Sequence, residues 1–141
     1  MTEKTKALFE AYEAAFNKLD VDAQVPYFAP HFIAAGPKGS IAHSRDEFAK
    51  MSQQAAQFYR SVGQTGARLL STSETQISNE YSIVKTHWAC TFEKLGDQAV
   101  EFDVSYLIEE LPGQDPKILL FISHEDEEEA MKKLGLLAKQ G

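Results

Sequence analysis

Two long segments of alternating apolar residues, 81–93 and 100–110, constrain the fold of this chain more than any other feature. Side chains on a strand point alternately to its two faces, so each segment places one set of apolar side chains on a single face. These sets are Val84, Trp88, Cys90 and Phe92 in the first segment and Val100, Phe102, Val104, Tyr106 and Ile108 in the second. The residues between them, 94–97, predict a turn, so the two strands are expected to form one wall of an apolar pocket.

Shorter patterns extend this pair of strands into a sheet. Two more strands are predicted over 67–77 and 117–123, and a short extended hairpin over 32–42. The short turns between the later strands imply an antiparallel meander. Strands longer than the usual five or six residues generally need bulges, so the alternation is expected to slip at some point.

The N-terminal part of the chain predicts three helices. Apolar residues over 8–19 recur at helical spacing, and Asp22 is expected to cap a short second helix. Ser44 and Glu47 form a capping box that opens a third helix, which is expected to end at Gly63. The predicted buried stripe of the third helix is Phe48, Met51, Ala55, Phe58 and Tyr59.

Helices followed by strands indicate the α+β class, with three N-terminal helices packed against a curved antiparallel sheet. A short C-terminal helix is expected to begin within the run His-Glu-Asp-Glu-Glu-Glu at 124–129, because acidic residues in its first turn and lysines in its last turn complement the helix dipole. The chain of 141 residues fits one domain, 1–141.

Charge and composition argue against several kinds of partner. The formal charge of −7 and the scattered lysines disfavour nucleic acid. The longest apolar run, 118–122, is too short to span a membrane. Cys90 is the only cysteine, so no intrachain disulfide can form. The N-terminus has no signal-peptide pattern, and we expect a cytoplasmic protein.

Four sequence motifs carry a family resemblance. They are Ala-Tyr-Glu-Ala-Ala-Phe at 11–16, Tyr-Phe-Ala-Pro-His-Phe at 27–32, Ser-Arg-Asp-Glu-Phe at 44–48 and Glu-Phe-Asp-Val-Ser-Tyr-Leu-Ile at 101–108. Together they resemble the nuclear-transport-factor-like (NTF2-like) superfamily, also called cystatin-like, and within it the SnoaL-like group and its ketosteroid-isomerase relatives. The resemblance implies a cone in which helices fill the hollow of a bent sheet around an apolar pocket. It also implies a homodimer formed through the convex face.

The ketosteroid isomerases provide a residue-level comparison. Their chemistry needs a carboxylate base and two buried hydrogen-bond donors for the enolate oxygen. The resemblance places the donors at Tyr12 and Tyr106 and the base at Gly36. Glycine has no carboxylate, so isomerase chemistry of that type is not expected.

Histidines are the remaining candidates for acid–base chemistry. His43 precedes the third helix and is either a cavity-mouth residue or a solvent-facing loop residue. His124 follows the last strand and is either a pocket-rim residue or a residue packed at the start of the last helix. His87 and Asp103 have the opposite strand parity to the apolar set, which indicates the convex face, and there Asp103 is a candidate for a dimer contact. The four histidines lack metal-ligand spacing, and neither a metal nor a cofactor is expected.

Two functions of different class follow from these patterns. The first is binding of a small hydrophobic molecule without turnover. The expected pocket residues are Tyr12, Phe16, Phe32, Phe48, Trp88, Tyr106 and Phe121. The second is an isomerase, dehydratase or cyclase acting on a hydrophobic carbonyl compound, with Tyr12 and Tyr106 as donors and His43 or His124 as the acid–base group. A third possibility is an interaction scaffold that uses the convex face.

Overall fold

The structure is a computed structural model that describes residues 1–126, 129, 131–132 and 135. The first helix, α1 (Glu3–Asn17), is capped by Thr2, whose side chain accepts a hydrogen bond from the amide of Thr5. Leu19 then adopts a positive φ of 53°, which reverses the chain before α2 (Val21–Gln24). Asp20, and not the expected Asp22, caps this second helix, because the reversal at Leu19 brings the Asp20 carboxylate within 3.1 Å of the Ala23 amide.

The expected hairpin and capping box are both present. A 3₁₀ turn, η1 (Val25–Tyr27), leads into β1 (Phe28–Gly36), which pairs with β2 (Gly39–Ser44). Ser44 caps α3 (Arg45–Ser61) by accepting from the Glu47 amide, and its own hydroxyl lies 3.0 Å from the Glu47 carboxylate. Gly63 ends this segment at a φ of 85°, a conformation that side chains with a Cβ disfavour.

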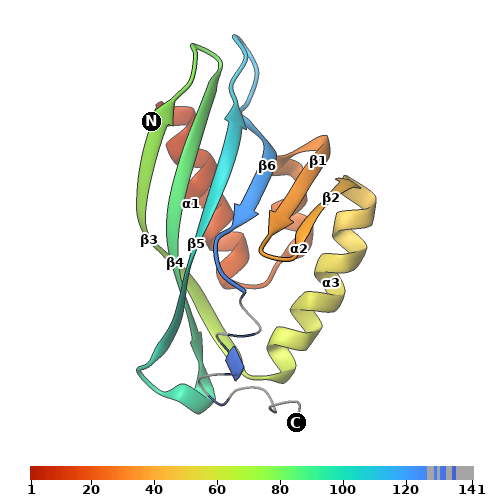
Figure 1. The fold of residues 1–141 in the computed structure, drawn as a ribbon, viewed down its shortest axis with the longest axis vertical. Coiled ribbons are helices and arrows are strands. Elements are labelled where there is room, and N and C mark those ends of the chain that lie inside the picture. The colour runs from red at the N-terminus through yellow and green to blue at the C-terminus, as the bar shows by residue number, and fades with distance from the viewer. Residues whose placement is uncertain (127–128, 130, 133–134, 136–141) are drawn as a thin grey trace.

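Six strands form one curved sheet in the order β2-β1-β6-β5-β4-β3. The later strands are β3 (Gln64–Gln76), β4 (Tyr81–Phe92), β5 (Ala99–Glu109) and β6 (Lys117–Ser123), with η2 (Glu93–Leu95) in the β4–β5 connection. They form the predicted antiparallel meander (Figure 1). The sheet as a whole is mixed rather than antiparallel, because β1 runs parallel to β6. Turn lengths specify only how consecutive strands pair, and β1 and β6 are not consecutive.

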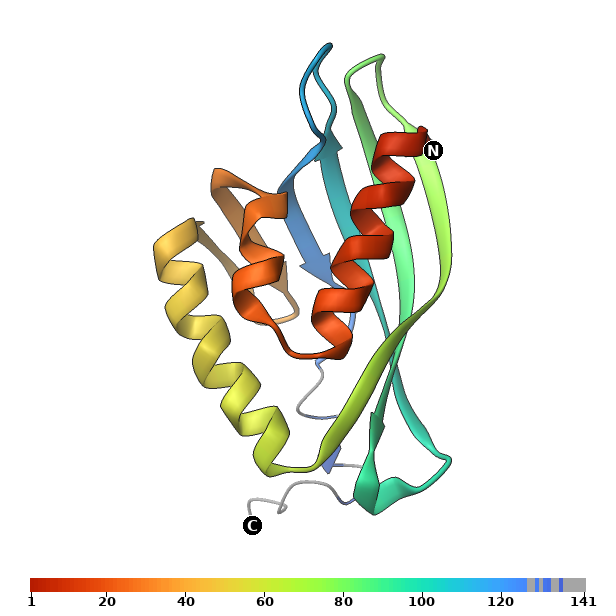
Figure 2. The ribbon, with the colours of Figure 1, turned by 180° about the vertical axis from the view of Figure 1, so that it is seen from behind.

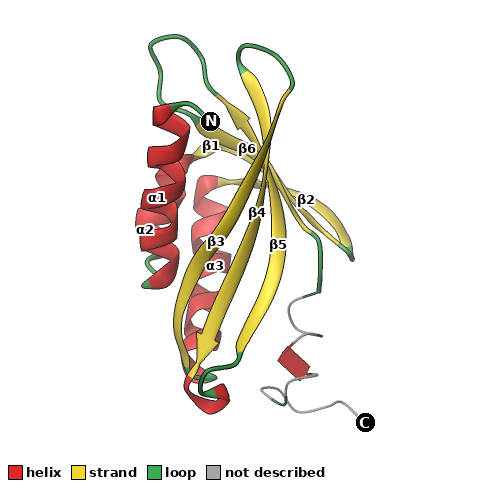
Figure 3. Ribbon diagram, turned by 90° about the vertical axis from the view of Figure 1, so that its left-hand side faces the viewer, coloured by secondary structure: helices red, strands yellow, loops and turns green. Residues whose placement is uncertain are grey.

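The strand alternation holds where the sequence pattern is strongest. β4 and β5 pair without interruption from Tyr81↔Glu109 to Thr91↔Ala99. The expected bulges occur elsewhere, in the pairings of β3 with β4, β5 with β6 and β1 with β6. All three helices lie on one face of the sheet (Figures 2 and 3). The predicted apolar set of β4 and β5 faces them and is buried.

Side chains of α1 tie this helix to the edge strand β3. The Asn17 side-chain oxygen accepts from the Ala67 amide at 2.9 Å, and the Glu13 carboxylate accepts from the Leu69 amide at 2.6 Å. Gly66 permits this close approach, since a Cβ built there would lie 2.6 Å from the Asn17 oxygen. The contacts satisfy edge amides that would otherwise be open to another strand.

Two arginines fix α3 against the rest of the molecule. Arg45 donates two hydrogen bonds to the Phe28 carbonyl, at 2.9 and 2.6 Å. Arg60 donates to the Leu19 carbonyl at 3.0 Å. Both ends of α3 are therefore held against the α1–α2 layer and β1. Most of the expected C-terminal helix lies outside the described residues.

Candidate functional site

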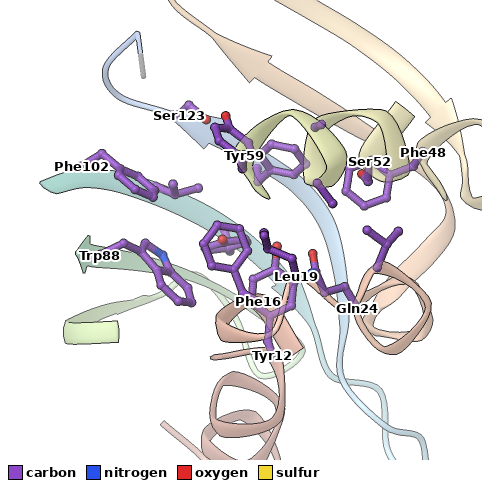
Figure 4. A pocket seen from close by; sticks show the side chains of 16 residues that line it. Tyr12, Phe16, Leu19, Gln24, Phe48, Ser52, Tyr59, Trp88, Phe102 and Ser123 are labelled. Atoms are coloured by element: carbon purple, nitrogen blue, oxygen red, sulfur yellow. The ribbon is translucent and has the colours of Figure 1, made fainter. Parts of the chain in front are cut away.

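A cavity of about 180 Å³ lies between the helices and the concave face of the sheet (Figure 4). Its wall draws on all three helices and on β4, β5 and β6. The lining residues are Tyr12, Phe16, Leu19, Val21, Gln24, Phe48, Ser52, Ala55, Ala56, Tyr59, Trp88, Phe102, Val104, Tyr106, Phe121 and Ser123. No carboxylate, imidazole, ammonium or guanidinium group belongs to this set, so in the described part of the chain the wall is uncharged.

Six of the seven expected pocket residues line this cavity, and Phe32 does not. Phe32 is 3% exposed and packs behind the wall, with its ring centre 4.6 Å from that of Phe28 and 4.9 Å from that of Phe48. The Phe32 ring also lies 6.4 Å from that of Phe121, so Phe32 packs against two lining residues and belongs to the supporting core. Strand parity alone could not separate a lining residue from one covered by a helix side chain.

Tyr12 and Tyr106 meet at the cavity, as the sequence predicted. Their ring centres are 5.8 Å apart at an interplanar angle of 73°, and Tyr12 is also 6.0 Å from Trp88. Such edge-to-face contacts hold aromatic rings in fixed orientations.

Trp88 is fixed by its own strand. Its indole N–H donates to the Thr86 hydroxyl at 2.8 Å, and Thr86 donates to the Val104 carbonyl at 2.7 Å. The indole N–H is thereby satisfied inside the protein, and Trp88 offers the cavity only its ring.

Neither candidate histidine lines the cavity. His43 is 4% exposed and packs against Phe32 and Phe48 at ring distances of 6.1 and 6.4 Å, and its Nδ1 has no hydrogen-bond partner in the described structure. It is therefore neither at the cavity mouth nor in a solvent-facing loop. His124 lies on the convex side, where its Nε2 is 2.7 Å from the Ser105 hydroxyl.

The convex face of β4 and β5 carries a charged cluster, defined as Lys85, His87, Glu101 and Asp103. His87 Nδ1 lies 2.6 Å from Asp103 and its Nε2 lies 2.8 Å from Glu101. Hydrogen bonds to Asp103 and then to Glu101 raise the pKa of His87 above its ordinary value. The hydrogen bond from His87 lowers the pKa of Asp103, with Lys85 adding a smaller effect. The cluster lies on the opposite face from the cavity, as parity predicted for His87 and Asp103.

Solved structures identify the architecture. An NTF2-like protein with a cystatin-like fold from Novosphingobium aromaticivorans superposes with a TM-score of 0.72 at 13% identity, over 97% of this chain and 88% of that one. The chain has the NTF2-like fold. A second NTF2-like protein, of unknown function, from Shewanella oneidensis gives a TM-score of 0.71 at 15% identity, covering 87% and 98% of the two chains.

A ketosteroid isomerase-like protein from Erwinia carotovora atroseptica shares this NTF2-like fold, with a TM-score of 0.61 at 15% identity over 84% of this chain and 91% of that one. Identities this low establish the fold alone. No protein-family model matches the sequence, and no curated protein matches it. The resemblance seen in the sequence is thus confirmed at the level of the NTF2-like fold.

Gly36 lies close to the cavity of this NTF2-like cone. A Cβ built on it would be 3.7 Å from the Cβ of Ser123, which lines the cavity. Ser123 and Tyr59 also line a shallow depression beside the β1–β2 turn, where Lys38 pairs with Asp126 at 3.2 Å. The position that resembles an isomerase base is therefore near the cavity, but it carries no side chain.

Sequence reasoning missed the contribution of α2 and misassigned part of α3. Val21 and Gln24 line the cavity, although a four-residue helix gives almost no periodic signal. On α3 the cavity side is formed by Phe48, Ser52, Ala55, Ala56 and Tyr59, whereas Met51 and Phe58 are 52% and 41% exposed. The apolar pattern favoured the large side chains of Met51 and Phe58, whereas the small residues Ser52 and Ala56 line the cavity. The small size of these two residues was the sequence signal that could have placed them there.

The described residues contain no group of three or more histidine, cysteine or acidic residues placed to hold a metal ion. No helix among them is long and apolar enough to cross a membrane.

Proposed function

We propose that this protein binds a small apolar molecule in the cavity beneath α1, α2 and α3. The observation that carries the proposal is a cavity of about 180 Å³ whose described lining residues are uncharged and half aromatic, with Tyr12 in edge-to-face contact with Trp88 and Tyr106. An apolar cavity of about 150 Å³ in another protein is known to bind benzene. Pockets for drug-sized ligands measure about 300–1,000 Å³, so a molecule of one or two rings fits this cavity better than a steroid.

The make-up of the wall favours binding over turnover. General acid–base catalysis requires a proton-transfer group within hydrogen-bond reach of the substrate, directly or through one water. His43 packs against Phe48 and is not among the lining residues, His124 bonds to Ser105 on the convex face, and position 36 is glycine. Tyr12 and Tyr106 are then most simply the amphipathic part of a binding wall.

Binding is tested by titrating p-xylene into the protein and following chemical shifts and the unfolding temperature. A ligand that prefers the folded state raises the apparent stability by mass action. In Ser52→Leu a larger side chain projects from the cavity wall, and we expect at least a tenfold loss of p-xylene affinity with the fold retained. Gln53→Leu, on the exposed side of the same helix, is the control and should bind as the wild type does. Equal p-xylene affinity in all three proteins would contradict a site in this cavity.

The alternative is an isomerase, dehydratase or cyclase that uses Tyr12 and Tyr106, because both tyrosines line the same cavity. A small β,γ-unsaturated ketone, 3-cyclohexen-1-one, tests its isomerase form by the ultraviolet absorbance of the conjugated product. We expect the rate with protein to equal the rate in buffer. A faster rate that disappears in Tyr12→Phe would favour the enzyme.

A homodimer through the convex face is the second part of the proposal. Ile83, Leu107, Leu120 and Ile33 follow one another across β4, β5, β6 and β1 by direct register pairing. Ile33, Ile83 and the neighbouring Ile122 are 42%, 40% and 41% exposed. This apolar row lies on the face opposite the helices, and a second copy would cover it. A cytoplasmic location and membership of the SnoaL-like branch stay predictions.

A further inference from the structure

Among the described residues of the cavity wall, Gln24 is the one with an amide side chain. It is the last residue of α2, which Asp20 caps, and it lies three residues after Val21, so the two side chains share one face of that short helix. Both line the cavity, and Figure 4 shows the Gln24 side chain directed into the space between the helices and the sheet.

Gln24 is buried as a residue, but its side-chain amide is not sealed inside the protein. The residue is 6% exposed, and its amide makes no hydrogen bond to any described residue. The amide is not one of the fully enclosed polar groups of the described structure, so its remaining surface faces the cavity that Gln24 lines. A side-chain amide has two N–H donors and a carbonyl acceptor, and buried polar groups in folded proteins are normally satisfied. An amide that faces a cavity and has no partner among the described residues is therefore available to a ligand that occupies the cavity.

The rest of the wall limits the chemistry of that partner. No charged side chain lines the cavity within the described residues, so an ionic ligand would lose hydration without gaining a counter-charge. Phe16, Trp88 and Phe48 supply aromatic surface from different sides. The indole N–H of Trp88 is already bonded to Thr86, so it does not compete with Gln24 as a donor.

We infer that Gln24 selects an uncharged aromatic ligand of one or two rings that carries a hydroxyl, carbonyl or amide group facing this residue. The ring occupies the apolar part of the cavity, and the polar group exchanges a hydrogen bond with the Gln24 amide. This inference rests on the proposed binding function. It adds the chemical class of the ligand and the residue that recognises its polar group.

The test uses two probes of nearly equal shape, p-xylene and p-cresol, which differ by a methyl group in place of a hydroxyl. Calorimetry or chemical-shift titration gives the affinity of each for the wild type and for Gln24→Met, an apolar replacement of similar length. We expect the wild type to bind p-cresol about tenfold more tightly than p-xylene, which corresponds to one good hydrogen bond. Gln24→Met should bind p-xylene at least as well as the wild type and lose the preference for p-cresol.

The outcomes separate the two proposals. If both probes bind the wild type but the p-cresol preference is absent, or persists in Gln24→Met, the role of Gln24 is wrong and cavity binding stands. If neither probe binds the wild type, the proposed function fails and this inference fails with it. Gln24→Met should also unfold at or above the wild-type temperature, because it removes an amide that makes no hydrogen bond to any described residue; a lower temperature would indicate a structural role. Gln24→Leu repeats the comparison if Gln24→Met does not fold.

Discussion

Trp88 and His87 are neighbours on β4 and lie in opposite environments. The Trp88 ring is 1% exposed, and its N–H is satisfied by Thr86 inside the protein. The His87 side chain is 37% exposed and lies between two carboxylates on the convex face. One strand thus builds a cavity wall and a charged surface from alternate residues. We expect substitutions on the cavity face to lower the free energy of unfolding through lost packing. Substitutions in the charged cluster should change it only slightly, by an amount that depends on pH.

Trp88→Ala should have the largest effect. Removing a buried tryptophan leaves a cavity, and losses of roughly 3–5 kcal/mol are typical. Urea unfolding measures the change. His87→Ala, one residue away, is the matched control and should cost about 1 kcal/mol or less, because exposed ion pairs contribute little. Similar losses for the two variants would show that the two faces are not energetically distinct.

Ile122→Glu tests whether the apolar row on the convex face is an interface. Ile122 neighbours this row, so a glutamate there would bury an unpaired charge in each copy of the dimer, and an uncompensated buried charge costs roughly 3–5 kcal/mol. We expect wild-type dimers and monomeric Ile122→Glu in sedimentation velocity experiments. Ile77→Glu, at an exposed isoleucine outside the row, should still dimerise. If the wild-type protein is monomeric at high concentration, the proposed homodimer is wrong.

Thr86→Val tests whether hydrogen bonding on the cavity face contributes to the free energy of unfolding. Valine matches the shape of threonine but leaves the Trp88 N–H and the Val104 carbonyl each without the Thr86 hydroxyl. An unsatisfied buried polar group costs about 1–3 kcal/mol, measured as a fall in the free energy of unfolding. Ser105→Ala removes a hydroxyl that bonds to exposed His124 and serves as the convex-face control, with little expected change. If Thr86→Val is as stable as the wild type, this network does not support the wall.

The smallest expected effect is the pH dependence of the charged cluster. The pKa of His87 is raised in the folded state, mainly by Asp103, so its contribution is complete below about pH 6.5 and is lost as the pH rises through the raised value. The pKa of Asp103 is lowered, so its contribution is present above about pH 4 and is lost as the pH falls through the lowered value.

The cluster should therefore stabilise the fold most between about pH 4 and 6.5. The difference in unfolding free energy between the wild type and His87→Gln should be largest near pH 5–6 and shrink toward pH 9, within about 1 kcal/mol throughout. An NMR titration of the His87 ring measures its pKa directly. A His87 pKa at or below the ordinary value would contradict the contacts with Asp103 and Glu101.

Much of the cavity wall was predictable because strand alternation is a local rule. The pairing of β4 with β5 contains no bulge, so counting from Val84 to Phe92 assigned every apolar residue to the correct face. Tyr12 and Phe16 followed from helical spacing in the same way. Phe32 was expected in the cavity wall but does not line it, and the sequence left open whether His43 and His124 lie at the cavity. These positions depend on what packs over them.

By itself, the sequence determined the α+β class, the order of helices and strands, and the aromatic face of β4 and β5. Periodicity, caps and turns act over a few residues, so they can be read without knowing distant contacts. The tertiary structure alone decided that β1 runs parallel to β6, that His124 faces away from the cavity, and that the α2 residue Gln24 lies in its wall. These features arise where segments far apart in the chain meet, and such contacts leave no local pattern.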